Sequence, residues 1–527
     1  MPWWALAVVP AAAVLAWLAA GVMTQRAQGA HLPPLADLTA VAAPIREALV
    51  EADAQARRAT NGATVGALAR AYHANLRAAD ALTMYALAER LAPAEWTWTY
   101  LRALLLEERG DQAAARVALE RVTAMAPAFG PAWYRLGELA FKQRRLDDAQ
   151  TAYERARDAA GAPPFTSPFT SPFTAPVTPP GVASRQTVPL SAYAGLGLAR
   201  VALDRQDAAS ATTRLRVLVD SYPAFGPARA LLRTEERRAS PGATAPPPPD
   251  RAFEAPFVPP ADPLLDAIVA DSRHSDLLLK HAGIATRAGD AAWREFLVRR
   301  ALTYNPQDLN VLMEAAAMLQ ATGRAAEALP FLKQHETLAP GDHHTLVEEG
   351  RVLSDLGRLQ EAEAVLRRAV VVRDAAAEYN LGAVLDEQGR WDEARPHYAR
   401  ALVIDPFHAR AMNNLGVGLD RHGDSPAALA LFERAIDIAP SSAEFYVNYG
   451  SALIQLRRFD HAARVLGTAV ALDPRAPNAH NNLGIALASL GDLPRARQEF
   501  TQALALDPRH ANARRNLDRV TAVLGGR

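Results

Sequence analysis

Five asparagines recur at a constant interval of 34 residues, and amide side chains at such a spacing can bind polypeptide. They are Asn380, Asn414, Asn448, Asn482 and Asn516, and a second amide precedes two of them at Asn413 and Asn481. An asparagine side chain offers one hydrogen-bond acceptor and two donors, so it can pair with both polar groups of a peptide unit. A row of such amides can hold an extended chain by its backbone, with little dependence on its sequence. We predict that these seven residues line a peptide-binding groove.

The same spacing also has an architectural explanation. Each amide can instead hydrogen-bond to the next repeated unit and set the pitch of a superhelix. Asparagine in a helix interior costs roughly 0.6 kcal/mol relative to alanine. Five such positions cost about 3 kcal/mol together, so some interaction is expected to compensate. The sequence leaves both roles open.

Residues suited to catalysis form no recognisable constellation. The sequence contains no HExxH, no GxSxG and no phosphate-binding P-loop. His343 and His344 are adjacent and diverge on a helix, while Glu348 and Glu349 are typical of a helix start. The chain has no cysteine, which excludes disulfides, Cys-ligated zinc and thiol catalysis. We predict a non-catalytic protein without a cofactor or metal site.

The charge balance bears on the class of partner. Lys and Arg number 57, as do Asp and Glu, so the formal net charge is +0. A protein held on nucleic acid by bulk charge carries an excess of basic residues. We therefore predict no nucleic-acid partner.

The asparagines belong to a repeated unit that is clearest at residues 409–442. Its first half carries an apolar helical stripe, a glycine ends the first helix, small residues allow close helix packing, and a proline ends the second helix. These positions are Met412, Leu415, Gly416, Leu419, Gly423, Ala428, Phe432, Ala435 and Pro440. The unit resembles the tetratricopeptide repeat, whose length is 34 residues.

Further units follow the same pattern across the chain. They are residues 62–95, 96–129, 130–160, 192–225, 275–308, 309–342, 343–374, 375–408, 443–476 and 477–510. Unit 343–374 is two residues short, and Arg457 stands where glycine is usual. The resemblance implies an all-α, right-handed solenoid in two arrays. It also implies that the first helix of each unit faces a concave surface and that the partner is a protein or peptide.

The segments outside the repeats complete the predicted organisation. The division is 1–24 transmembrane anchor or signal segment, 25–61 tether and capping helix, 62–160 repeat units, 161–190 Pro/Thr-rich insert, 191–238 repeat unit and capping helix, 239–261 Pro-rich linker, 262–510 second array and 511–527 C-terminal capping helix. Asp262 and Pro263 stand in the order of an N-cap and first helical residue. We place the boundary between the arrays near residue 250.

The N-terminal segment governs the predicted location. Residues 3–23 carry no charge, and 21 residues suffice to span a bilayer as a helix. A cleaved secretory signal is the alternative. We predict a membrane-anchored protein with periplasmic repeats; a secreted protein and a cytoplasmic orientation are the alternatives. The oligomeric state is not predicted.

Together these features predict a non-catalytic scaffold or assembly factor that binds extended polypeptide in a concave groove. One alternative is an accessory subunit of an envelope enzyme or maturation system, of the cytochrome-maturation or glycosylation type. Another is a structural spacer.

Overall fold

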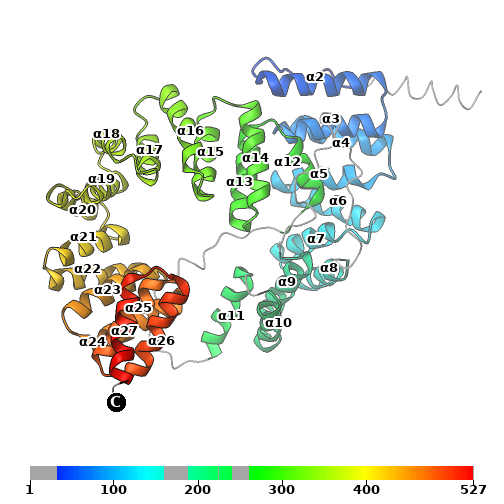
Figure 1. Ribbon diagram of the computed structural model, residues 1–527. Coiled ribbons are helices and arrows are strands. Elements are labelled where there is room, and N and C mark those ends of the chain that lie inside the picture. The colour runs from blue at the N-terminus through cyan, green and yellow to red at the C-terminus, as the bar shows by residue number, and fades with distance from the viewer. Residues whose placement is uncertain (1–31, 160–187, 223–224, 240–259, 261, 526–527) are drawn as a thin grey trace, which may run out of the picture. The chain divides into compact units, whose positions relative to one another are not determined.

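A computed structural model describes residues 32–159, 188–222, 225–239, 260 and 262–525. These residues form 26 helices and no strand (Figure 1). The all-α prediction is confirmed for the described residues. They pack as two compact units, residues 1–318 and 319–527, and the division falls within helix α15, Leu309–Ala321.

The first unit stacks helical hairpins, which bury two apolar clusters. Its helices are α2 Ala43–Arg58, α3 Gly62–Ala74, α4 Ala78–Leu91, α5 Trp96–Glu108, α6 Gln112–Met125, α7 Gly130–Lys142, α8 Leu146–Ala159, α9 Leu190–Asp204, α10 Ala208–Ser221, α11 Gly226–Ala239, α12 Pro263–Asp271, α13 Ser275–Ala288 and α14 Ala291–Tyr304. Antiparallel partners such as α3 and α4, or α7 and α8, correspond to the first and second helices of the predicted repeats.

The second unit continues the same hairpin pattern (Figure 1). Its helices are α16 Ala325–Leu338, α17 His343–Asp355, α18 Leu359–Ala369, α19 Ala375–Glu387, α20 Trp391–Ile404, α21 Ala409–Arg421, α22 Ser425–Ile438, α23 Ala443–Gln455, α24 Phe459–Leu472, α25 Pro477–Ser489, α26 Leu493–Leu506 and α27 Ala511–Gly525. Each hairpin packs on the next, and first helices also contact first helices. This is the arrangement of a solenoid, in which each unit buries its apolar face against its neighbours.

Small residues and turn geometry explain why each unit closes as a hairpin. A β-carbon at Gly416 would lie 2.9 Å from the ring of Phe432, so only glycine permits this approach of α21 to α22. Gly423 turns the chain with a φ of +88°, a region that β-carbons disfavour. Arg457 adopts a φ of +55° at the equivalent turn, so it takes up a conformation that costs an L-residue roughly 1–2 kcal/mol.

A tryptophan joins two successive hairpins of the second unit. Trp391 begins α20, and its ring lies against Gly418 on α21 and stacks on His422, with ring centroids 5.3 Å apart. A β-carbon at Gly418 would come within 1.9 Å of the Trp391 ring. The missing side chain at Gly418 is therefore a condition for the close packing of α20 on α21.

Several predictions concern residues at the ends and in the linkers. The predicted membrane-spanning or signal segment lies outside the described residues, as do most of the Pro/Thr-rich insert and most of the Pro-rich linker. Within the described part of the chain, no helix combines the length and apolar character that a membrane crossing requires. The sequence assigns residues 262–318 to the second array, whereas in the structure they pack within the first compact unit.

The contact between Trp391 and Gly418 generates a stability prediction. Gly418→Ala should lower the free energy of unfolding by about 1–3 kcal/mol, because the added methyl group overpacks the α20–α21 contact. Gly467→Ala is the matched control, since no atom lies within 4 Å of the place that its new methyl group would take on α24. That control should gain about 0.5–1 kcal/mol from the lower chain entropy of alanine. Urea unfolding followed by circular dichroism measures both, and equal stabilisation by the two substitutions would contradict the packing argument.

Candidate functional site

The predicted asparagines lie at equivalent places on successive first helices. With each unit numbered from its first residue, Asn380, Asn414, Asn448, Asn482 and Asn516 occupy position 6 of α19, α21, α23, α25 and α27. All five are partly exposed. Asn413 and Asn481, at position 5, are buried, with 1% and 4% of their surface exposed. The seven side chains therefore divide into a buried pair and a partly exposed row.

The buried asparagines link one repeat to the next. Asn448 donates its amide to Oδ1 of Asn413 over 2.9 Å, and Asn413 donates to Oδ1 of Asn414 over 3.1 Å. The same arrangement recurs one repeat pair later. Asn516 donates to Asn481 over 3.1 Å, and Asn481 donates to Oδ1 of Asn482 over 3.1 Å. Position 5 of one unit is thus an acceptor for position 6 of the following unit.

A second set of polar contacts joins consecutive first helices two helical turns later. It links position 13 of one repeat to position 12 of the repeat before it. Arg421 pairs with Asp386 over 2.7 Å. Gln455 donates to Asp420 over 2.8 Å. The two sets lie seven residues apart on each helix, which places them on one helical face. Together they fix how consecutive first helices align, which is the architectural role that the sequence left open.

The position-5 residue decides which amides remain available to a partner. In the repeat that precedes Asn448 this residue is Asn413, and in the repeat that precedes Asn516 it is Asn481. In the repeat that precedes Asn414 it is Tyr379, and the Asn414 amide lies 3.4 Å from the Tyr379 hydroxyl. In the repeat that precedes Asn380 the position-5 residue is Val347, and in the repeat that precedes Asn482 it is Val447. Neither valine has a polar side-chain group that could pair with the asparagine. In the described structure, the Asn380 amide and the Nδ2 group of Asn482 form no hydrogen bond.

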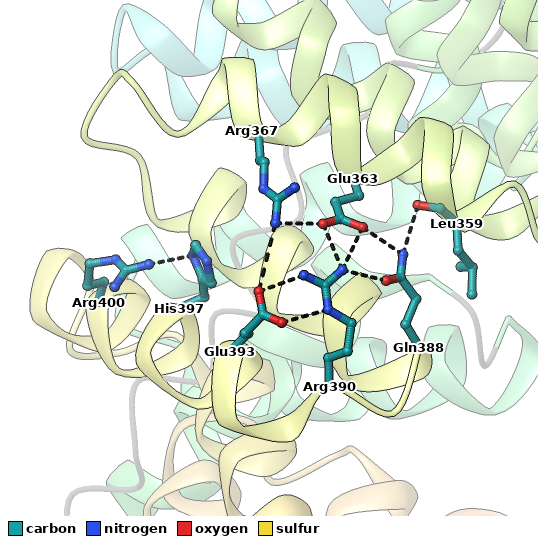
Figure 2. A network of polar contacts seen from close by, with 8 residues as sticks. All are labelled: Leu359, Glu363, Arg367, Gln388, Arg390, Glu393, His397 and Arg400. Carbon is teal, nitrogen blue, oxygen red and sulfur yellow. Dashed lines mark hydrogen bonds and ion pairs between the residues drawn. The ribbon is translucent and has the colours of Figure 1, made fainter.

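Figure 2 shows a separate polar network between α18 and the turn that joins α19 to α20. Glu363 of α18 accepts hydrogen bonds from Gln388 over 3.0 Å and from Arg390 over 2.8 Å. Arg367 lies 2.6 Å from the same carboxylate. Although burial opposes it, hydrogen bonds from Arg390 and Gln388 keep the pKa of Glu363 below its ordinary value. The network joins the shortened repeat 343–374 to its successor, so we assign it a structural role.

The first unit uses the same positions differently. Tyr100 is at position 5 of α5 and Arg135 at position 6 of α7, and Arg135 Nε donates to the Tyr100 hydroxyl over 3.0 Å. Both contact Asp262, which precedes α12: Tyr100 donates to its carboxylate over 2.5 Å, and Arg135 lies 3.1 Å from it. Burial, and then the charge of Asp262, raise the pKa of Tyr100 well above its ordinary value, so the hydroxyl stays a donor.

Sequence reasoning missed this cluster. A signal was present, because Tyr100 and Arg135 stand at the positions that carry the asparagines in the second unit. The described residues contain no group of three or more histidines, aspartates or glutamates arranged to hold a metal ion. The arrangement offers hydrogen-bond donors and one guanidinium on a helical face, which suits recognition of polypeptide.

A stack of helical hairpins with this polar face defines a helical-repeat protein of the solenoid class. Models of the family described as tetratricopeptide repeat match residues 113–163, 373–441 and 448–517. These segments of the chain are therefore identified as tetratricopeptide repeats. No curated protein matches its sequence.

The chain is similar to several solved structures. The APC/C hetero-tetramer Cut9–Hcn1 is 14% identical, with a TM-score of 0.41 over 84% of this chain and 93% of that chain. YrrB, described as a TPR protein with an unusual peptide-binding site, is 21% identical, with a TM-score of 0.28 over 34% and 95%. PilF of Pseudomonas aeruginosa is 20% identical, with a TM-score of 0.33 over 35% and 84%.

The position-6 asparagines that bond to the preceding repeat and those that do not should differ in how much their substitution changes the free energy of unfolding. Asn448→Ala should destabilise the second unit by about 1–3 kcal/mol, because it leaves the buried Oδ1 of Asn413 without its donor. Asn380→Ala is the matched substitution without such a bond, and the better helix propensity of alanine should make it neutral or stabilising by up to about 0.6 kcal/mol. Urea unfolding of the full chain compares them. An identical effect of the two substitutions would show that the inter-repeat bond contributes nothing.

Proposed function

We propose that the chain is a protein-interaction scaffold whose second unit binds extended polypeptide along its first helices. The main support for this proposal is that only some asparagines of the row are paired within the protein. Asn413 and Asn481 are consumed in contacts between repeats, whereas Asn380 and Asn482 keep amide groups available at a partly exposed surface. A side-chain amide that has no partner within the protein can complete its hydrogen bonds when the backbone of a bound polypeptide supplies the missing donor and acceptor.

The first unit provides independent support for this proposal. Its equivalent positions, Tyr100 and Arg135, already hold a segment of polypeptide through Asp262. The same face of the repeat can therefore accommodate a chain and pair with its polar groups. In the second unit the available groups are neutral amides, so we propose that recognition there relies on the partner's backbone.

Backbone recognition gives a direct test. A fluorescently labelled pool of random twelve-residue peptides should bind the full chain, and a pool with N-methylated backbones should lose at least tenfold in affinity. Asn380→Ala combined with Asn482→Ala should cause a similar loss in fluorescence anisotropy titrations, because both substitutions remove backbone-pairing groups. Arg395→Ala combined with Arg497→Ala is the control, since these exposed residues lie on the second helices α20 and α26.

A structural spacer is the second candidate, and the buried contacts of Asn413 and Asn481 favour it. If the unmethylated pool does not bind, or if the Asn380/Asn482 variant binds it as the natural chain does, the asparagine row is architectural. The role as an accessory subunit of an envelope enzyme, the membrane anchor and the periplasmic location stay predictions from the sequence.

A further inference from the structure

The segment that follows the Pro-rich linker returns to the first helices of the first unit. Helix α12 packs against α3 (Figure 1), and Leu264 and Ile268 join the apolar cluster of the first unit. Leu264, Ile268 and Val269 are each at most 1% exposed. A helix of nine residues is too short to be stable alone in water, so its place depends on these contacts.

A carboxylate anchors each end of this segment. Asp262 caps α12 by accepting from the Leu265 amide over 3.2 Å, and its other oxygen contacts Tyr100 and Arg135. Nine residues later, Asp271 pairs with Arg70 of α3 over 2.5 Å. Asp262 is 6% exposed, and the side chains of Arg70 and Asp271 are 6% and 16% exposed. Charged groups this buried are retained only where their partners satisfy them.

The contacts just beyond Asp271 are of a different kind. The backbone carbonyls of Ser272 and Arg273 accept from Arg300 over 2.7 Å and from Asn305 over 3.0 Å. Arg273 also donates its backbone amide to Asn75 over 3.3 Å and its guanidinium to the Pro44 carbonyl over 2.7 Å. These bonds attach the exit of the segment to α14, to α2 and to the end of α3, and they do not involve the carboxylates of Asp262 and Asp271. The segment can therefore leave the face of α3, α5 and α7 while its exit stays attached at residues 272–273.

We propose that Arg70, Tyr100 and Arg135 form a binding site for an acidic helical segment, and that α12 is its resident, exchangeable ligand. The occupant in trans is a partner protein segment with two carboxylates nine residues apart and apolar side chains between them, as in Asp262 to Asp271. A ligand tethered in cis acts at an effective concentration in the millimolar range, so α12 keeps the site closed until such a partner competes. This site is distinct from the asparagine row and does not depend on the function proposed for it.

The test measures whether the protein binds the same segment when it is added as a separate peptide. The probe is a labelled synthetic peptide with the sequence of residues 260–273, and the host is the full chain carrying Asp262→Asn and Asp271→Asn. Asparagine keeps the N-cap acceptor at residue 262 but removes its charge. The double variant should bind the peptide at least tenfold more tightly than the natural chain, because its own segment competes less well. Asp276→Ala is the control, since this exposed carboxylate lies on α13 outside the site and should change nothing.

Two further arms assign the binding to the site. Adding Arg135→Ala to the double variant should abolish peptide binding, as should replacing both aspartates of the peptide by asparagine. Adding Asn380→Ala and Asn482→Ala should leave it unchanged, which separates this site from the asparagine row. A double variant that retains its circular dichroism spectrum but binds no better than the natural chain would show that α12 is only a structural element.

Hydrogen exchange of the natural chain covers the case in which the double variant does not fold. Excess unlabelled peptide should accelerate exchange of the α12 amides at least tenfold and leave α4 and α6 unchanged. Unaltered exchange in α12 at saturating peptide would overturn the proposal.

Discussion

The polar contact between consecutive first helices is the constraint on which the rest of the second unit depends. Each first helix must align with the one before it. The bonds from position 6 to position 5 and from position 13 to position 12 supply that alignment for the pairs α19–α21, α21–α23 and α25–α27. Apolar packing alone is non-directional and tolerates sliding of one hairpin on another. Buried hydrogen bonds penalise such sliding, because a displaced donor leaves a buried acceptor unpaired. The same residues therefore set both the architecture and the chemistry of the face.

The residue at position 5 explains why the asparagines of the row differ in their pairing. Where position 5 is asparagine or tyrosine, the amide that follows is paired within the protein. Where position 5 is Val347 or Val447, the following amide keeps its bonding capacity. The first unit shows a third outcome, because Tyr100 and Arg135 bond to each other and also to Asp262. The residue at position 5 thus decides whether the following side chain is paired within the protein.

The sequence predicted the repeats well but not how the asparagine side chains pair. Gly416, Gly423 and Pro440 recur in register because turns and close helix contacts permit few residue types, so the helices could be located closely. The split between buried Asn413 and partly exposed Asn414 was not predicted, because it depends on bonds between residues 35 apart. The position of α12 was missed for a related reason. The contacts that hold α12 join residues separated by 162 and by 201 positions in the sequence. Contacts at such separations leave no local periodicity in the sequence.

The central claim is that extended polypeptide binds along the first helices of the second unit, and site-specific photo-crosslinking tests it most directly. A photoreactive amino acid replaces Ala383, which is partly exposed on α19 about one turn from Asn380, and is compared with the same group at position 395, an exposed place on the second helix α20. We expect the random peptide pool to crosslink at 383 and not at 395. Equal crosslinking at both positions, or crosslinking at 395 alone, would contradict it.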